Sequence, residues 1–178
     1  MVTDRGEKWQ TDLMRRYPQL FGGRGYPTVG DGWRDLLERA LKRIAAAVAR
    51  EPAGSAVQIV QIKEKFGTLR LYFDGHKVSE KALAKVREAI ELAEARSACT
   101  CETCGEEGLL YDRRGWYLTR CPRHSAGEPV EIKPGRDNLL IVRTASPGKA
   151  GSVTCRRYDR TRDVFVKAPL PPDFDDGS

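Results

Sequence analysis

Four metal-binding side chains stand in two short pairs near the middle of the chain. Cys101-Glu-Thr-Cys104 is followed, after sixteen residues, by Cys121-Pro-Arg-His124. Zn²⁺ favours thiolate and imidazole ligands, and two such pairs on separate turns supply the four ligands of a closed tetrahedral site. The spacing therefore predicts a structural zinc site in a zinc knuckle or ribbon, with Cys101, Cys104, Cys121 and His124 as its ligands.

The remaining cysteines leave alternatives open. Cys99 competes with Cys101 as the first ligand, although the two-residue gap favours the pair of Cys101 and Cys104. Cys155 is far away in the sequence and is expected to be structural. In a reducing compartment the five cysteines of the chain could instead all be free thiols.

The sequence favours a structural over a catalytic role for this metal site. A catalytic zinc keeps one position open for water and has a base beside it, whereas four protein ligands are available here. The His-x-Glu spacing of zinc deaminases and the His-Glu-x-x-His spacing of metalloproteases are absent. Only His76 and His124 are histidines. We therefore expect no catalytic residues, and an enzyme of unrecognised chemistry ranks third among the functions considered.

Hydropathy and charge limit where the protein acts. The first eight residues include four charged side chains and lack the apolar stretch of a signal peptide. No apolar run approaches the roughly 20 residues needed to cross a bilayer. We expect a cytoplasmic protein with no membrane partner. The net charge of +6 is uneven, because residues 132–167 hold nine Lys and Arg against three Asp.

Helices are predicted on both sides of a strand-rich stretch. Residues 7–20 contain a predicted short helix that ends at Tyr17-Pro18, because a residue before proline avoids the helical conformation. Apolar residues recur at three-and-four spacing over residues 31–50 and 79–96, which predicts two longer helices. Asp31 and Ser79 stand where the N-caps of these two helices are expected.

A β-hairpin is predicted between the two longer helices. Residues 57–63 and 68–73 have the composition of strands, with a turn at 65–67. The helices would supply the apolar cover that an isolated hairpin lacks. The basic residues of the hairpin are candidate nucleic-acid contacts: Lys63, Lys65 and Arg70. The alternative is that they are solvated side chains on the open face of a sheet.

The segment 99–128 is expected to form the zinc knuckle. Residues 109–111 and 116–119 read as two strands joined by a turn, which would bring the second ligand pair back beside the first. Trp116 and Leu118 are expected to pack against the metal loop.

A set of short motifs resembles a known family. The motifs are Tyr17-Pro18-x-Leu20-Phe21, Gly30-Asp-Gly-Trp33, Ile62-Lys-Glu-Lys-Phe-Gly-Thr-Leu-Arg70 and Cys101-Glu-Thr-Cys104-Gly105 with Cys121-x-x-His124. Together they resemble a family of small, uncharacterised phage- and prophage-associated bacterial proteins, over about residues 13–125. The resemblance implies a zinc-binding element and a phage or mobile-element setting. It implies no activity, substrate or catalytic residue.

The C-terminal part of the chain reads as a small basic β module over residues 129–168. Three short strands are predicted, at 138–143, 152–158 and 164–167. The turn Gly148-Lys-Ala-Gly-Ser-Val153 resembles the glycine-lysine turn of KOW-type small β-barrels. Clustered arginines beside Tyr158 could neutralise phosphates and stack a base. These candidate nucleic-acid contacts are Arg156, Arg157, Arg160 and Arg162.

Two alternatives apply to this basic module. Two of its arginines could pair with Asp159 and Asp163 in a hairpin turn, and a charged patch could also meet an acidic protein. Residues 169–178 are proline-rich and then acidic, and are expected to form an extended or disordered tail that could fold back on the basic patch.

These observations combine into one expectation of architecture and function. We expect an α+β domain over residues 1–98, with helices packed on a β-hairpin, followed by the zinc knuckle and the small C-terminal β module. The expected function is that of a phage-derived zinc-binding accessory protein that binds nucleic acid or a nucleic-acid-bound complex. The alternative is a protein-interaction module that inhibits a host defence or transcription complex, with a host or phage protein as its partner.

Overall fold

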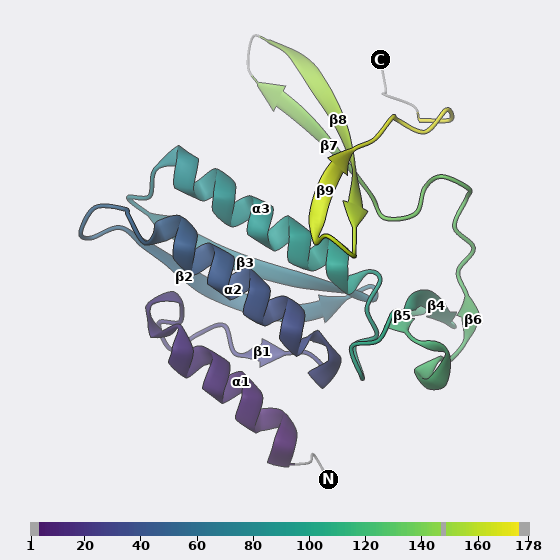
Figure 1. Ribbon diagram of the computed structural model, residues 1–178, viewed down its shortest axis with the longest axis horizontal. Helices are drawn as coiled ribbons and strands as arrows, with labels where there is room; N and C mark the ends of the chain where they lie inside the picture. The colour runs from purple at the N-terminus through teal and green to yellow at the C-terminus, as the bar shows by residue number, and fades with distance from the viewer. Residues whose placement is uncertain (1–3, 147–148, 175–178) are drawn as a thin grey trace. The chain divides into compact units, whose positions relative to one another are not determined.

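The computed structural model describes residues 4–146 and 149–174. The chain divides into two compact units, the first ending at Val130 and the second beginning at Glu131. The described residues form three α-helices and three small sheets (Figure 1). The predicted mixed α+β class is therefore confirmed.

The helices of the first unit begin close to the predicted positions. Ser79 caps α3 as predicted, because its Oγ accepts a hydrogen bond from the Ala82 N–H over 3.2 Å. The prediction for Asp31 is wrong, because this carboxylate accepts from the indole N–H of Trp9 at 2.7 Å instead of capping a helix. The helical elements are α1 (Asp4–Arg16), η1 (Pro18–Leu20), η2 (Asp31–Trp33), α2 (Arg34–Val48) and α3 (Glu80–Ser97).

The first sheet contains the predicted hairpin. Its order is β1-β2-β3, with β1 parallel to β2 and β2 antiparallel to β3. The strands are β1 (Pro27–Thr28), β2 (Ala56–Lys65) and β3 (Thr68–His76). Phe66 and Gly67 form the turn with φ values of +55° and +75°, as a two-residue hairpin loop of the matching twist requires.

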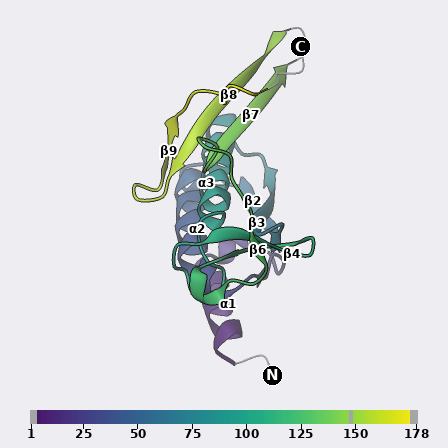
Figure 2. The same ribbon diagram turned by 90° about the vertical axis from the view of Figure 1, so that its right-hand side faces the viewer.

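Helices α2 and α3 cover one face of this sheet (Figure 2). The core between them is apolar, and its largest fully buried side chains include Trp33, Leu37, Leu41, Ile44, Ile59, Ile62, Leu69 and Val86. Because side chains alternate along a strand, the residues between these buried positions lie on the opposite face. That outer face includes Tyr72, which is 45% exposed.

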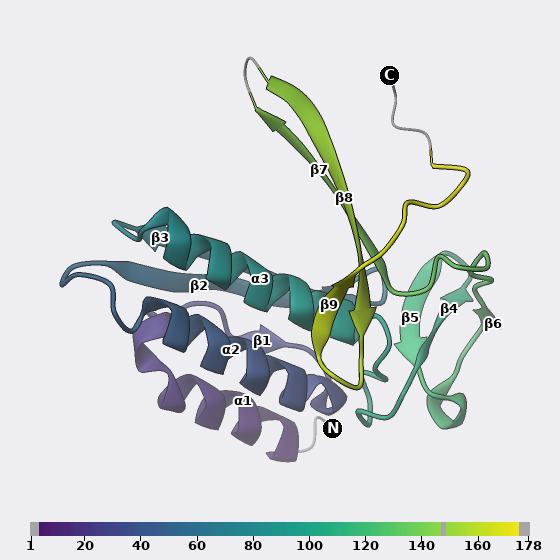
Figure 3. The same cartoon turned by 45° about the horizontal axis from the view of Figure 1, so that its top comes forward.

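The second sheet lies beside the end of the first sheet where β2 turns into β3 (Figure 3). Its order is β5-β4-β6, and its strands are β4 (Leu109–Arg113), β5 (Trp116–Arg120) and β6 (Glu128–Pro129). The prediction that Trp116 packs against the metal loop is wrong, because its side chain is 67% exposed. Leu118 is half-buried.

The second unit is a three-stranded antiparallel sheet of β7 (Leu139–Ser146), β8 (Lys149–Asp159) and β9 (Val164–Lys167). Cys155 and Tyr158 are buried, and Tyr158 donates to the Asp163 carboxylate at 2.7 Å. Gly148, with which the KOW-like turn begins, lies outside the described residues. The tail returns to its own unit, where Asp173 pairs with Lys133 over 3.1 Å and also with Arg136.

Candidate metal centre

The four predicted ligands come together in the first unit. One potential ligand atom from each of Cys101, Cys104, Cys121 and His124 lies within 4.8 Å of all the others. The Sγ atoms of Cys104 and Cys121 are 3.6 Å apart. The Nδ1 atom of His124 lies 3.3 Å from Cys121 Sγ and 3.7 Å from Cys101 Sγ. This cluster could hold a metal ion.

Three of the six separations in this cluster are close to the edges of a zinc tetrahedron. With Zn–S bonds of about 2.3 Å and Zn–N bonds of about 2.0 Å, tetrahedral angles place two sulfur atoms about 3.8 Å apart and a sulfur and a nitrogen about 3.5 Å apart. The observed separations of 3.3 to 3.7 Å are close to both values. They are far longer than a disulfide bond of about 2.0 Å. The donor set and its spacing therefore fit Zn²⁺.

Each ligand pair is closed by a main-chain hydrogen bond. The Gly105 N–H donates to the Cys101 carbonyl at 2.8 Å, and the His124 N–H donates to the Cys121 carbonyl at 3.0 Å. Gly105 has a φ of +82°, a conformation that glycine adopts without steric penalty. Cys121 follows β5, and His124 ends the short helix η3 (Pro122–His124).

The environment of Cys101 favours a thiolate. Burial opposes its ionisation, but the main-chain N–H groups of Cys121, Cys104 and Thr103 stabilise the anion and lower the pKa of Cys101 to about 6. A thiolate is the form that binds a metal ion. Cys101 is therefore prepared to bind a cation at neutral pH. The Glu106 N–H lowers the pKa of Cys104, but burial, the hydrogen bonds with Cys121 and Cys101 and the charge of Cys101 outweigh it, so the pKa of Cys104 is raised.

Cys99 is not part of the cluster. Its thiol is directed at the end of α3, where it donates to the Arg96 carbonyl at 3.3 Å. Its own carbonyl accepts from the Gly108 N–H at 3.1 Å. Of the two candidates for the first ligand, the structure thus brings Cys101 to the other three.

Glu102 ties the first ligand loop to the helical core. One carboxylate oxygen accepts the Gly30 N–H at 3.0 Å, and the other accepts from the Arg120 guanidinium at 3.0 Å. Its carbonyl oxygen accepts the Gly32 N–H at 2.8 Å. Both side chains of the Glu102–Arg120 pair are largely buried, with 14% and 17% exposed, so the pair is little screened by water.

The Gly30-Asp-Gly-Trp33 motif is the surface on which this loop rests. A Cβ on Gly32 would collide with the Cys101 carbonyl and with the main-chain nitrogens of Gly105 and Cys104. The fully buried Trp33 donates from its indole nitrogen to the Thr100 carbonyl at 2.9 Å. The contact between this motif and the ligand loop was not predicted from the sequence. Two glycines that flank an aspartate before a tryptophan could have indicated a close approach of two main-chain segments.

The hairpin turn of the first sheet supports the second ligand pair. Thr119 is fully buried on β5 and donates from Oγ1 to the Gly67 carbonyl at 2.7 Å. A Cβ on Gly67 would stand 2.6 Å from Leu110 Cδ1 and 3.2 Å from the Thr119 nitrogen. The motifs that are far apart in the sequence thus meet around the Cys/His cluster.

The predicted basic residues of the first unit share one face. In the β2–β3 register, Lys63 pairs with Arg70, Lys65 with Thr68 and Gln61 with Tyr72. These positions alternate with buried Ile62, Leu69 and Leu71, so Lys63, Lys65 and Arg70 lie on the outer face of the sheet. The Nζ atom of Lys63 is 5.4 Å from the centroid of the Tyr72 ring.

The predicted basic residues of the second unit are more dispersed. Arg157 donates to the Asp137 carboxylate at 2.8 Å and to the Gly135 carbonyl at 2.7 Å. Arg156, its neighbour on β8, stacks its guanidinium 4.4 Å from the centroid of the Phe165 ring. The other two, Arg160 and Arg162, lie in the turn between β8 and β9.

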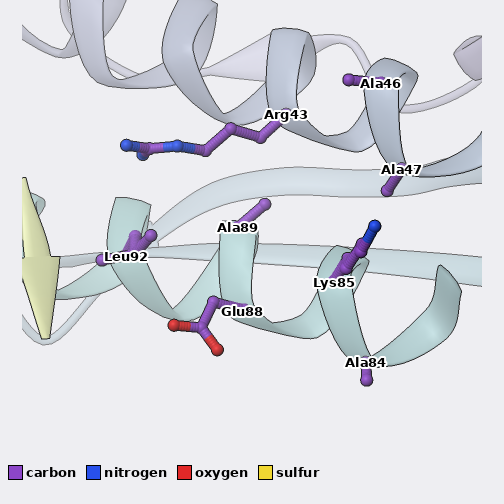
Figure 4. Close-up of a pocket in the computed structure, with 8 residues that line it drawn as sticks. All are labelled: Arg43, Ala46, Ala47, Ala84, Lys85, Glu88, Ala89 and Leu92. Atoms are coloured by element: carbon purple, nitrogen blue, oxygen red, sulfur yellow. The ribbon is translucent and has the colours of Figure 1, made fainter. Parts of the chain in front are cut away.

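A separate hollow of about 450 Å³ lies between α2 and α3 (Figure 4). Its described lining is formed by small apolar side chains with three charged ones, namely Arg43, Ala46, Ala47, Ala84, Lys85, Glu88, Ala89 and Leu92. The charged residues of this described lining are Arg43, Lys85 and Glu88, with Glu88 as the single carboxylate.

Comparison with protein-family models, curated proteins and solved structures gives no match to this chain. None of the helices in the described part of the chain combines the length and apolar character needed to span a bilayer.

Proposed function

We propose that this chain is a zinc-stabilised accessory protein that binds nucleic acid, or a complex containing nucleic acid, in the phage or prophage setting that its motifs resemble. Zn²⁺ would be held by Cys101, Cys104, Cys121 and His124. With four protein ligands, the ion supplies a crosslink that stabilises the fold.

One observation carries the nucleic-acid part of this proposal. Lys63, Lys65 and Arg70 occupy adjacent register positions of the first sheet. The Arg70 guanidinium donates to the Thr68 hydroxyl and the Leu69 carbonyl of its own strand, at 2.7 Å each. The turn at the end of the sheet is bonded to β5, which leads into Cys121. A row of cations on a rigid sheet can follow a phosphate backbone. Bound Zn²⁺ would hold the β4–β5 hairpin in place beside these basic residues.

The test is the salt dependence of binding, measured by fluorescence anisotropy with labelled DNA and RNA oligonucleotides. We expect binding to weaken steeply with salt, and Lys63→Ala/Lys65→Ala to lower the slope of log K against log salt by about two, one for each lost phosphate contact. Lys42→Ala/Lys81→Ala is the matched control, because it removes the same charge from the exposed sides of α2 and α3.

The control variant should bind with the wild-type slope. Binding that does not change with salt, or an equal change of slope in both variants, would refute this surface. Capture of a partner from a lysate that survives nuclease treatment, without any oligonucleotide binding, would favour a protein-interaction module instead.

A further inference from the structure

Two hairpin turns border a hollow on the first unit. The turn between β2 and β3 and the turn between β4 and β5 line a space of about 330 Å³. Its lining is Glu64, Lys65, Phe66, Gly115, Trp116 and Tyr117. The hydrogen bond from Thr119 to the Gly67 carbonyl joins the two hairpins whose turns form the walls of the hollow.

Two of the three aromatic side chains in this lining lie outside the core. Phe66 is 63% exposed and Trp116 is 67% exposed. Phe66 also has a φ of +55°, where a hairpin turn favours Asn, Asp or Gly and where a bulky side chain is uncommon. Neither the turn nor the core explains an aromatic residue at position 66. A ligand that stacks on its ring would explain it.

The charge around the hollow is positive. Segments 63–70 and 112–117 contain five Lys and Arg residues and two acidic residues. Both acidic side chains are engaged by turn amides, since Glu64 accepts from the Gly67 N–H and Asp112 accepts from the Gly115 N–H, each at 2.6 Å. Lys65 holds its Nζ 5.2 Å from the centroid of the Phe66 ring. A planar, anionic ligand fits both features.

We propose that this hollow binds one unpaired base of a single-stranded nucleic acid, stacked against Phe66 and Trp116, while Lys63 and Lys65 hold the adjoining phosphates. This inference rests on the proposed function and specifies its substrate. Exposed aromatic rings beside a basic groove are the means by which proteins grip single strands without reading their sequence. In a duplex the faces of the bases are already stacked on one another, so no base is available to stack on the two rings.

The decisive experiment compares three labelled probes of equal length by anisotropy: oligothymidylate, the same strand with abasic sugars, and a duplex. Oligothymidylate should bind at least tenfold more tightly than the abasic strand of equal charge.

Phe66→Ala and Trp116→Ala should each weaken the binding of oligothymidylate about tenfold or more. Their salt slope should stay at the wild-type value, since no phosphate contact is lost. Leu109→Ala, which removes another exposed apolar side chain from β4, should bind as the wild type does.

Intrinsic fluorescence gives an independent readout. Of the three tryptophans, Trp9 and Trp33 are buried and Trp116 is exposed. Oligothymidylate should therefore quench the emission of Trp116. Trp116→Phe should abolish this quenching and keep most of the affinity, because a phenyl ring still stacks.

The outcomes separate the two proposals. If all three probes bind equally, if the duplex binds best, or if the aromatic variants bind as the wild type does, the stacking site is refuted and the proposed function stands. If a dimer forms through this face and Trp116→Ala converts it to a monomer, the stacking site is likewise refuted. If no probe binds, the proposed function itself fails.

Discussion

The indole nitrogen of Trp33 donates a hydrogen bond to the carbonyl oxygen of Thr100, 2.9 Å away. Trp33 is fully buried at the start of α2, and Thr100 directly precedes the first ligand of the Cys/His cluster. The helical core and the candidate metal loop are therefore parts of one structure. The stability of each should depend on the other.

Replacing Trp33 by Phe tests this coupling. The variant leaves the Thr100 carbonyl without its indole donor and opens a small cavity, so the free energy of unfolding should fall by about 2 kcal/mol or more. Urea denaturation of the zinc-loaded protein measures this change. An unfolding free energy equal to that of the wild type would contradict the coupling.

The close approach at Gly32 makes a sharper prediction. A methyl group at Gly32 meets main-chain atoms of Cys101, Cys104 and Gly105, none of which can move without moving the ligand loop. Gly32→Ala should therefore release zinc to a chromogenic chelator much faster than the wild type does. Gly54→Ala is the matched control, because a Cβ added there would have no atom within 4 Å. The φ of +88° at this position adds only local strain, of about 1 kcal/mol. Equal zinc release from both variants would argue against the contact.

The tail of the second unit should respond to acid. The hydrogen bond from Arg136, and then that from Lys133, lowers the pKa of Asp173 to about 2 from its ordinary 3.8. Because the folded-state pKa is lowered, the contact is complete above about pH 4 and is lost as the pH falls toward 2. Carboxyl NMR should give a midpoint near 2 for Asp173. Arg136→Ala should raise this midpoint, and an ordinary midpoint in the wild type would contradict the contact.

Arg157 should act on stability more than on nucleic-acid binding. Its guanidinium donates to Asp137 and Gly135 within its own unit. Arg157→Ala should lower the melting temperature of the protein and leave the salt slope of binding nearly unchanged. Arg162→Ala, at an exposed turn position, is the comparison variant and should leave the melting temperature unchanged. A lower salt slope for Arg157→Ala at an unchanged melting temperature would show that the arginine contacts phosphate.

Local patterns predicted much of the fold. The spacing of apolar residues and the serine cap placed α3 correctly, because both signals act within one or two turns of helix. The strand composition around the turn at Gly67 placed the hairpin. The ligand spacing identified the four residues that the structure brings together.

Long-range contacts account for what was missed. Asp31 has the residue type of an N-cap, but the indole of Trp9 offers it a stronger tertiary partner. Trp116 was expected to pack against the metal loop, whereas its side chain is 67% exposed. The role of Glu102 depends on Gly30 and Arg120, which lie 72 and 18 residues away. No local sequence pattern carries that information.

The metal content of the purified protein tests the central claim most directly. Native mass spectrometry of protein produced without added metal should show one zinc ion per chain, and Cys121→Ser should lose it together with the ordered β4–β5 hairpin. Cys99→Ser, outside the cluster, should retain the ion. A wild-type protein with no bound metal and five freely reactive thiols would contradict the account.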